Sequence, residues 1–390
     1  MLRAFGSVST IAIFAVHSLA WVGGVQAADW TSAQDSQIDA RVAHFMRERH
    51  PQAPPAPPSL SLAIGLNGRL LIARGYGEAR AGHRATERTV YHIGSLTKQF
   101  TAAAVLRLIE ERSLAPLSGA PLSLDTDMSE IFSGVHAWTT RDEPPITIRS
   151  LLNMTSNLPN FTRRPPPNVD PWGAVPAPRL LGELKKISPR GWPHSFEYSN
   201  TSYFLLAQVI AASRNAPQET AASYRDYIRA ATITTAGLTG TGFVGDMPPG
   251  ADLAEPHFRR RPAFAKPDWL NGSGDMESNA LDIFAWNRAL MAGAIIGPDS
   301  LKAMFGDGGR VGPLTYYGMG WFIEHEQGWD SYFHSGSVPG YTSYNAILKR
   351  QGAPDWLSVT LLTNADGVEG LDALADELAD VVRAAIAQQD

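Results

Sequence analysis

A serine and a lysine stand three residues apart, at Ser95 and Lys98, directly before an apolar run that predicts a helix. Residues at this spacing share one face of a helix, one turn apart. A serine hydroxyl becomes a good nucleophile when a neighbouring base takes its proton. Burial and the positive end of the helix dipole both favour the neutral form of Lys98, which could then be that base. The backbone N–H of Ser95 could stabilise an oxyanion.

The same serine has a simpler interpretation as a helix N-cap, and a Ser-x-x-Lys match alone is weak evidence. Two observations favour chemistry. Lysine is uncommon in this chain, and Lys98 enters a helix that is otherwise apolar. Burying an ammonium without a partner is unfavourable, so a lysine at this position suggests a purpose. The pair still needs polar partners from elsewhere in the chain.

One candidate partner is Tyr198-Ser199-Asn200, at the entry to a second apolar helix. A tyrosine hydroxyl beside a lysine can carry a proton to a leaving group, and the amide of Asn200 can bind a substrate amide. Taken alone, this segment is better explained by a helix cap followed by a packed tyrosine.

Another candidate is His334-Ser335-Gly336-Ser337, on a predicted strand. Glycine within a strand often marks the close approach of a ligand or of another backbone. Here it would let a substrate lie along the strand, with the N–H of Ser337 completing an oxyanion hole. The alternative is an ordinary strand end before a turn.

These segments, in this order, resemble the motifs of the serine β-lactamase and penicillin-binding protein superfamily. The resemblance is to the branch that contains class C β-lactamases, D-alanyl-D-alanine carboxypeptidases and related esterases. Its pattern is Ser-x-x-Lys, Tyr-x-Asn and Lys/His-x-Gly. Three more stretches of this chain resemble family segments: Ser150 to Pro159, Gly272 to Met276 and Tyr317 to Trp321. The resemblance thus covers most of the chain.

Two departures from the family pattern narrow the expected activity. His334 stands where class C β-lactamases usually carry lysine, and His-x-Gly is seen in the peptidase, aminopeptidase and esterase members. Asn157 replaces a family glycine, although asparagine also tolerates a left-handed backbone. The sequence has neither a Ser-Asp-Asn triplet nor a Gly-x-Ser-x-Gly motif, which disfavours a class A β-lactamase and an α/β-hydrolase.

The resemblance implies acyl transfer without a cofactor or a metal. Ser95 would attack a carbonyl, Lys98 and Tyr198 would manage the protons, and the N–H groups of Ser95 and Ser337 would hold the oxyanion. Asn200 and the strand that carries Ser337 would bind the substrate, which could be a D-alanyl peptide, a β-lactam or an ester. The alternative is a penicillin-binding or sensing protein that is acylated without efficient turnover.

Composition excludes several other classes of protein. The chain of 390 residues has no cysteine, which rules out a thiol nucleophile, a disulfide framework, a thiolate zinc site and a lipid-modified cysteine. A formal net charge of −5 without a basic block argues against nucleic acid as a partner. His325-Glu326 begins like a zinc-protease motif but lacks the second histidine, so a hairpin turn is the better interpretation.

The N-terminus has the pattern of a signal peptide. A basic start at Met1 to Arg3 precedes a largely apolar run from Ile11 to Val22, and small residues flank Gln26 before Ala28. The apolar run is shorter than the about 18–20 residues that a membrane span needs. We therefore expect cleavage after Ala27 and a periplasmic or secreted protein without a stable membrane anchor.

The elements that must position these groups come from both ends of the chain. Apolar residues at helical spacing predict a helix over 32–49 and a closing helix over 371–386. Asn67-Gly68, between two strand-like runs, predicts a β-hairpin. Four more strands are expected near the C-terminus, at 321–325, 332–335, 344–349 and 357–363.

The middle of the chain is rich in predicted helices and loops. The expected fold is therefore α+β and β-lactamase-like, with an antiparallel sheet formed from both termini, flanked by helices, and a mostly helical region inserted. Residues 1–27 would be removed. Residues 28–115 and 256–390 would form the sheet domain, and residues 116–255 would form the inserted helical domain.

Overall fold

The computed structural model describes residues 30–49, 58–138, 144–192, 194–214, 221–259, 261–326 and 328–387. The predicted signal peptide, residues 1–27, lies outside these ranges. Within the described parts of the chain, no helix is long and apolar enough to cross a membrane.

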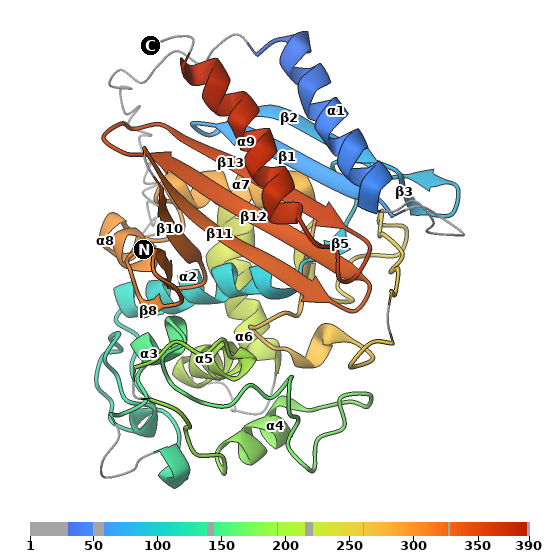
Figure 1. The fold of residues 1–390 in the computed structure, drawn as a ribbon. Coiled ribbons are helices and arrows are strands. Elements are labelled where there is room, and N and C mark those ends of the chain that lie inside the picture. The colour runs from blue at the N-terminus through green and yellow to red at the C-terminus, as the bar shows by residue number, and fades with distance from the viewer. Residues whose placement is uncertain are drawn as a thin grey trace, which may run out of the picture.

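An eight-stranded antiparallel sheet forms the centre of the molecule, in the order β2-β1-β13-β12-β11-β10-β9-β8 (Figure 1). The first strands of the chain pair directly with the last, so that Leu60 lies opposite Thr363. This confirms the predicted sheet built from both termini. The strands are β1 (Leu60–Leu66), β2 (Arg69–Tyr76), β8 (Gly309–Arg310), β9 (Thr315–Tyr317), β10 (Phe322–Glu326), β11 (Trp329–Val338), β12 (Tyr341–Arg350) and β13 (Trp356–Thr363).

The predicted hairpin joins β1 and β2 through Asn67 and Gly68. Both residues have positive φ angles, 52° and 79°, as a type I′ turn requires. The side chain of Asn67 also accepts a hydrogen bond from the N–H of Trp356 at 2.8 Å. The turn is thereby tied to the start of β13.

The strands expected near the C-terminus are present as β10 to β13. β11 is longer than predicted because β12 pairs with it along its whole length, through Val338. β10 pairs with β11 only as far as Phe333. Among the described strands, none pairs with this edge of β11 beyond Phe333, so the His334-to-Ser337 segment lies on an open edge.

Helices cover both faces of the sheet (Figure 1). The predicted terminal helices, α1 and α9, lie together on one face, where Ile38 and Leu374 belong to the same apolar cluster. On the other face lie α2 and α7, joined by Phe100 and Trp286, whose rings stack at 4.1 Å. These helices are α1 (Ser32–Arg49), α2 (Thr97–Glu110), α7 (Ala280–Met291) and α9 (Leu371–Ala387).

The middle of the chain forms the mostly helical part drawn below the sheet in Figure 1. Its longest helix, α5, is buried along most of its length and contacts α2, α3 and α6. Its elements are η2 (Met128–Glu130), η3 (His136–Trp138), α3 (Ile148–Leu152), α4 (Ala177–Leu184), α5 (Asn200–Ser213), α6 (Ala221–Ile228), the π-helical segment η4 (Arg229–Thr234) and β6 (Gly242–Phe243).

A second, three-stranded sheet in the order β5-β7-β6 links this middle part to the rest of the chain. Its strands are too short to show a periodic signal in the sequence, and we did not predict them. The division into two domains stays a prediction. The remaining elements are β3 (Glu78–Arg80), β4 (His83–Arg84), β5 (Tyr91–His92), η1 (Gly94–Leu96), η5 (Pro267–Trp269), β7 (Met276–Ser278) and α8 (Pro298–Met304).

Candidate active site

Ser95 lies in the 3-10 turn η1, immediately before α2 begins at Thr97. Gly94 has a φ of 51°, and a Cβ on it would lie 2.9 Å from the backbone nitrogen of Ser337. Glycine therefore allows both the backbone conformation and the close approach of this turn to β11. Ser95 is half-buried, whereas Lys98, one turn further on, is fully buried.

Three polar neighbours surround the side-chain nitrogen of Lys98. Nζ lies 3.0 Å from Oγ of Ser95, 2.7 Å from Oδ1 of Asn200 and 2.7 Å from the carbonyl oxygen of Ser273. None of the three is a carboxylate. Burial lowers the pKa of Lys98 well below its ordinary value, because the charged form loses its hydration.

A neutral amine matches these three neighbours. It has two N–H groups and one lone pair, since it has lost one of the three protons of an ammonium. The oxygens of Asn200 and Ser273 have no hydrogen to donate, so each accepts one N–H. The lone pair is then left for the hydroxyl proton of Ser95. The arrangement can therefore carry a proton from Ser95 to Lys98.

Tyr198 approaches the same serine from the loop before α5. Its hydroxyl donates a hydrogen bond to Oγ of Ser95 at 2.8 Å, and its ring centre lies 5.0 Å from Nζ of Lys98. Burial raises the pKa of Tyr198 above its usual value, so the phenol keeps its proton at neutral pH. With Lys98 neutral, Ser95 would have a proton donor on one side and a proton acceptor on the other.

Asn200 has its own contacts within the protein. Its Oδ1 accepts from Lys98, and its Nδ2 donates to Oγ1 of Thr162 at 2.9 Å. It is the first residue of α5, and the preceding Ser199 makes no side-chain cap hydrogen bond. The asparagine therefore helps to hold the lysine, and its predicted contact with a substrate stays a prediction.

The motif strand β11 packs against η1, which also contacts the neighbouring strand β12. Gly336 is so close to this turn that a Cβ on it would lie 2.1 Å from the carbonyl oxygen of Ile93. The residues alternate in exposure, with Ser335 and Ser337 exposed and His334 and Gly336 buried. The strand thus presents two exposed serine residues beside the turn that carries the candidate nucleophile.

Both ring nitrogens of His334 have partners. Nδ1 lies 2.6 Å from the carbonyl oxygen of Ser335, which can only accept, so Nδ1 carries the proton. Nε2 lies 3.1 Å from the hydroxyl of Tyr317, which donates to it. Burial and the nearby Lys98 lower the pKa of His334 to about 3. The ring is therefore neutral at physiological pH.

Three of these contacting residues were not singled out as site residues in the sequence. Ser273 and Tyr317 lie in segments that resemble the family, but no pattern indicated which atoms they would offer. Thr162 carried no signal, because it meets Asn200 only through the fold.

His325 and Glu326 were expected in a hairpin turn, but they are the last two residues of strand β10 and pair with β11. The ring nitrogens of His325 lie 2.8 Å from Asp330 and 2.9 Å from Asp307. Within the described ranges, no group of three or more histidine, aspartate or glutamate residues could hold a metal ion.

A sheet made from both termini, with serine, lysine and tyrosine in contact beside the end of an inner strand, is the arrangement of the serine β-lactamase and penicillin-binding protein superfamily. The chain belongs to the Beta-lactamase family, which it matches over residues 39–384.

Bacterial relatives share about a quarter of their residues with this chain. PbpX of Bacillus subtilis, named as a penicillin-binding protein, is 25% identical over 296 residues, which are 73% of this chain and 66% of PbpX. Protein flp of Staphylococcus aureus is 25% identical over 341 residues, 82% of this chain and 62% of flp. The chain thus spans no more than 66% of the length of these relatives.

Solved structures share the fold. The D-amino acid amidase of Ochrobactrum anthropi has a TM-score of 0.69 and 23% identity, covering 92% of this chain and 99% of the amidase. EstCE1, described as a hydrolase with promiscuous acyltransferase activity, has a TM-score of 0.70 and 19% identity, covering 90% of this chain and all of EstCE1.

Proposed function

We propose that this protein is a serine hydrolase that works through an acyl-enzyme on Ser95. The observation that carries the proposal is the position of Nζ of Lys98, between two oxygens that can only accept and the Ser95 hydroxyl. Because the amine is buried and these neighbours include no acid, its neutral form is favoured. A serine hydroxyl next to a neutral amine is a nucleophile paired with the base that activates it.

In the proposed acylation, Oγ of Ser95 bonds to the substrate carbonyl carbon while its proton passes to Lys98. The N–H groups of Ser95 and Ser337 stabilise the oxyanion. The hydroxyl of Tyr198 then protonates the leaving nitrogen or oxygen as its bond to the carbonyl breaks, and Lys98 returns the proton to Tyr198. In deacylation, the oxygen of a water molecule bonds to the same carbonyl carbon while its proton passes to the Lys98–Tyr198 pair. The bond from the carbonyl carbon to Oγ of Ser95 then breaks, and the same pair returns the proton to Oγ.

The proposed substrate is a D-alanyl peptide, a β-lactam or an ester. The names of the relatives cover this range, since they include a penicillin-binding protein, an amidase and a hydrolase with acyltransferase activity. Within the superfamily we favour the branch of D-alanyl peptidases and esterases, because His334 stands where class C β-lactamases carry lysine.

Ser335 and Ser337, which are exposed, would bind a substrate carboxylate through their hydroxyl groups. Replacing both with alanine should raise KM for a carboxylate-bearing D-alanyl peptide several-fold and leave KM for its C-terminal amide unchanged. An unchanged KM for the carboxylate would remove this part of the proposal.

The second candidate is a penicillin-binding protein that is acylated without efficient turnover, which the name of PbpX favours. A time course of labelling with a fluorescent penicillin separates the two. A label that is gained and then lost indicates a β-lactam hydrolase, and a persistent label indicates the binding protein. Absence of label with cleavage of p-nitrophenyl butyrate or D-phenylalanine amide indicates an esterase or amidase.

The variant Ser95→Ala is the control for every one of these probes. It should abolish both labelling and turnover while the protein remains folded by circular dichroism. Hydrolysis by this variant at the wild-type rate would show that Ser95 is not the nucleophile.

We also propose that the protein is exported, on the signal-peptide pattern of residues 1–27. Expression of the full chain in a Gram-negative host, followed by N-terminal sequencing of the periplasmic protein, should give a chain that starts at Ala28. A full-length chain found only in the cytoplasm would contradict this.

A further inference from the structure

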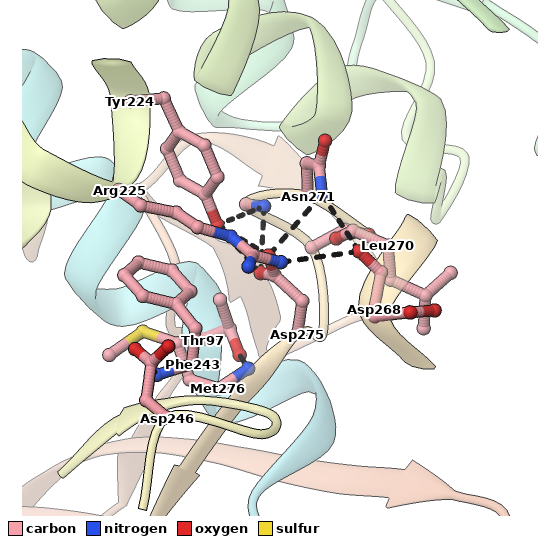
Figure 2. Close-up of polar contacts among 12 residues, drawn as sticks. Thr97, Tyr224, Arg225, Phe243, Asp246, Asp268, Leu270, Asn271, Asp275 and Met276 are labelled. Atoms are coloured by element: carbon pink, nitrogen blue, oxygen red, sulfur yellow. Dashed lines mark hydrogen bonds and ion pairs between the residues drawn. The ribbon is translucent and has the colours of Figure 1, made fainter. Parts of the chain in front are cut away.

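A buried aspartate outside the Ser95, Lys98 and Tyr198 group has a dense set of hydrogen-bond donors (Figure 2). Asp275 is fully buried. Its carboxylate accepts from the hydroxyl of Tyr224 at 2.7 Å, the N–H of Gly272 at 3.0 Å, Nη2 of Arg225 at 3.3 Å and Nδ2 of Asn271 at 3.4 Å. Each neighbour donates to the carboxylate and so favours its charged form, against the burial that raises the pKa of Asp275.

The carboxylate closes the turn that supplies one of the lysine's neighbours. Asp275 holds the N–H of Gly272 on one side of the turn. On the other side, the carbonyl of Gly272 accepts from Oγ1 of Thr101 at 2.8 Å, and the carbonyl of Ser273 accepts from Nζ of Lys98 at 2.7 Å. The turn is therefore held from both faces, with one carbonyl aimed at the lysine.

The donors on the far side come from a separate helix. Tyr224 and Arg225 belong to α6, and the guanidinium of Arg225 also lies 4.9 Å from the ring centre of Phe243 on β6. Gly272 fits closely against α5, since a Cβ on it would lie 2.7 Å from the carbonyl oxygen of Tyr203. The position of the turn is thus fixed by α5, α6 and β6 together.

A backbone carbonyl can orient the lysine only if the turn that carries it is rigid. A shift of about 1 Å at a catalytic group can lower a rate about a hundredfold. Burying a carboxylate is unfavourable unless its donors compensate. A turn that only connected two elements would not need a buried carboxylate, with its free-energy cost. The buried carboxylate holds the N–H of Gly272, in the same turn whose Ser273 carbonyl accepts from Lys98.

We infer that Asp275, with Tyr224 and Arg225, is a positioning residue for the general base. It fixes the Ser273 carbonyl so that one N–H of Lys98 is engaged, the lone pair faces Ser95 and water is kept from the amine. The inference rests on the proposed function, because it requires Lys98 to act as the base.

The test compares Asp275→Asn and Tyr224→Phe with a matched control, Asp282→Asn. Asp282 is also nearly buried, and it accepts from the N–H of Gly240 at 2.7 Å and from Oγ1 of Thr241 at 2.9 Å, away from the turn. The readout is the pH dependence of kcat and kcat/KM, per folded molecule, for whichever of p-nitrophenyl butyrate, D-phenylalanine amide and nitrocefin the wild type cleaves fastest.

With Asp275→Asn the turn loosens and water reaches Lys98, which raises the pKa of the amine. We expect kcat to fall about tenfold or more at pH 7 with KM little changed. The acidic limb of the kcat/KM profile should move to higher pH by about half a unit or more, so that part of the lost rate returns at pH 9. Tyr224→Phe should show the same changes to a smaller extent.

The control Asp282→Asn should lower stability and leave kcat and the acidic limb unchanged. An acidic limb that stays at its wild-type pH in Tyr224→Phe and in Asp275→Asn would overturn the inference, and Tyr224→Phe alone decides if Asp275→Asn does not fold. Failure of this inference can be told apart from failure of the proposed function. If only the inference is wrong, Ser95→Ala is still inactive. If Ser95→Ala were active, the proposed function itself would fail.

Discussion

Lys98 and Asp275 are two buried ionisable side chains on either side of the Gly272–Gly274 turn, and their hydrogen-bond neighbours differ. Lys98 is buried without an acid among its three polar neighbours. Asp275 is equally buried, yet every neighbour of its carboxylate is a donor, and one is the guanidinium of Arg225. Burial favours the neutral form of Lys98. Burial also raises the pKa of Asp275, but Arg225, Tyr224 and the N–H of Gly272 act against it and favour the carboxylate. A neutral Lys98 can exchange a proton with Ser95, whereas Asp275, whose carboxylate is engaged by four donors, can only fix its surroundings.

The largest effect that tests this comparison is on acylation. Lys98→Met removes the base, so the rate of covalent labelling of Ser95 should fall about a thousandfold or more. In Lys98→Arg the labelling rate should fall as far, because a guanidinium keeps its proton at any accessible pH. Labelling is followed with a fluorescent penicillin or, if that does not react, with a fluorophosphonate. The exposed Lys186, changed to methionine, is the matched control and should be fully active.

The next largest effect is on stability. Here a substitution at Asp275 should have the larger effect and a substitution at Lys98 the smaller one. Asp275→Ala leaves buried donors without their acceptor, so the free energy of unfolding should fall by about 3–5 kcal/mol. Lys98→Met exchanges a buried amine for an apolar side chain of similar length but leaves the oxygens of Asn200 and Ser273 without this donor, so the loss should be smaller, about 1–3 kcal/mol. Urea unfolding measures both. Equal losses in the two variants would mean that Lys98 is a charged, structural residue as well.

Glu277 on β7 is a third buried ionisable group. It shows the effect of burial on a carboxyl group that, unlike Asp275, has no ion pair with an arginine in the described structure. It lies 3.7 Å from His92 and accepts from the N–H of Met247 at 3.2 Å, and among the described residues no arginine forms an ion pair with it. Burial raises the pKa of Glu277 to about 7, from 4.5. A carboxyl whose pKa is higher in the folded chain stabilises the fold at low pH, and this contribution is lost as the pH rises from about 4.5 to about 7.

Glu277→Gln should remove that loss. The variant should be more stable than the wild type at pH 8, by about 1–3 kcal/mol, and similar to it at pH 4. Burial lowers the pKa of His92 to about 4, which acts in the opposite direction, so the quantity to compare is the difference between variant and wild type at each pH. A difference that does not vary with pH would show that Glu277 is already ionised in the folded protein.

Much of the fold could be predicted because its signals are local. Asn67 and Gly68 specify their turn through the backbone conformations they tolerate. The terminal helices and the C-terminal strands follow from apolar periodicity over short windows. The strands β5, β6 and β7 have two or three residues each and carry no period. Their pairing depends on distant segments, so the sequence did not indicate it.

The site divides in the same way. Ser95 and Lys98 are one turn apart, so their contact follows from helix geometry. The hydrogen bond from Lys98 to the carbonyl of Ser273 joins residues far apart in the chain and uses a backbone atom, which every residue has. Asp275 looks like any other aspartate until the fold buries it. Contacts of this kind depend on tertiary packing, which sequence patterns do not show.

The central claim is that Lys98 is neutral and takes the proton of Ser95. The most direct measurement is the pH dependence of the rate of Ser95 acylation in the wild-type protein, from pH 5 to pH 11 by rapid mixing. We predict that the rate rises along an acidic limb whose midpoint lies well below 10.5, the ordinary pKa of lysine, and that it reaches a plateau at pH values above that midpoint. A rate that keeps rising until pH 10 to 11 would show an ordinary lysine at this position and would contradict the account.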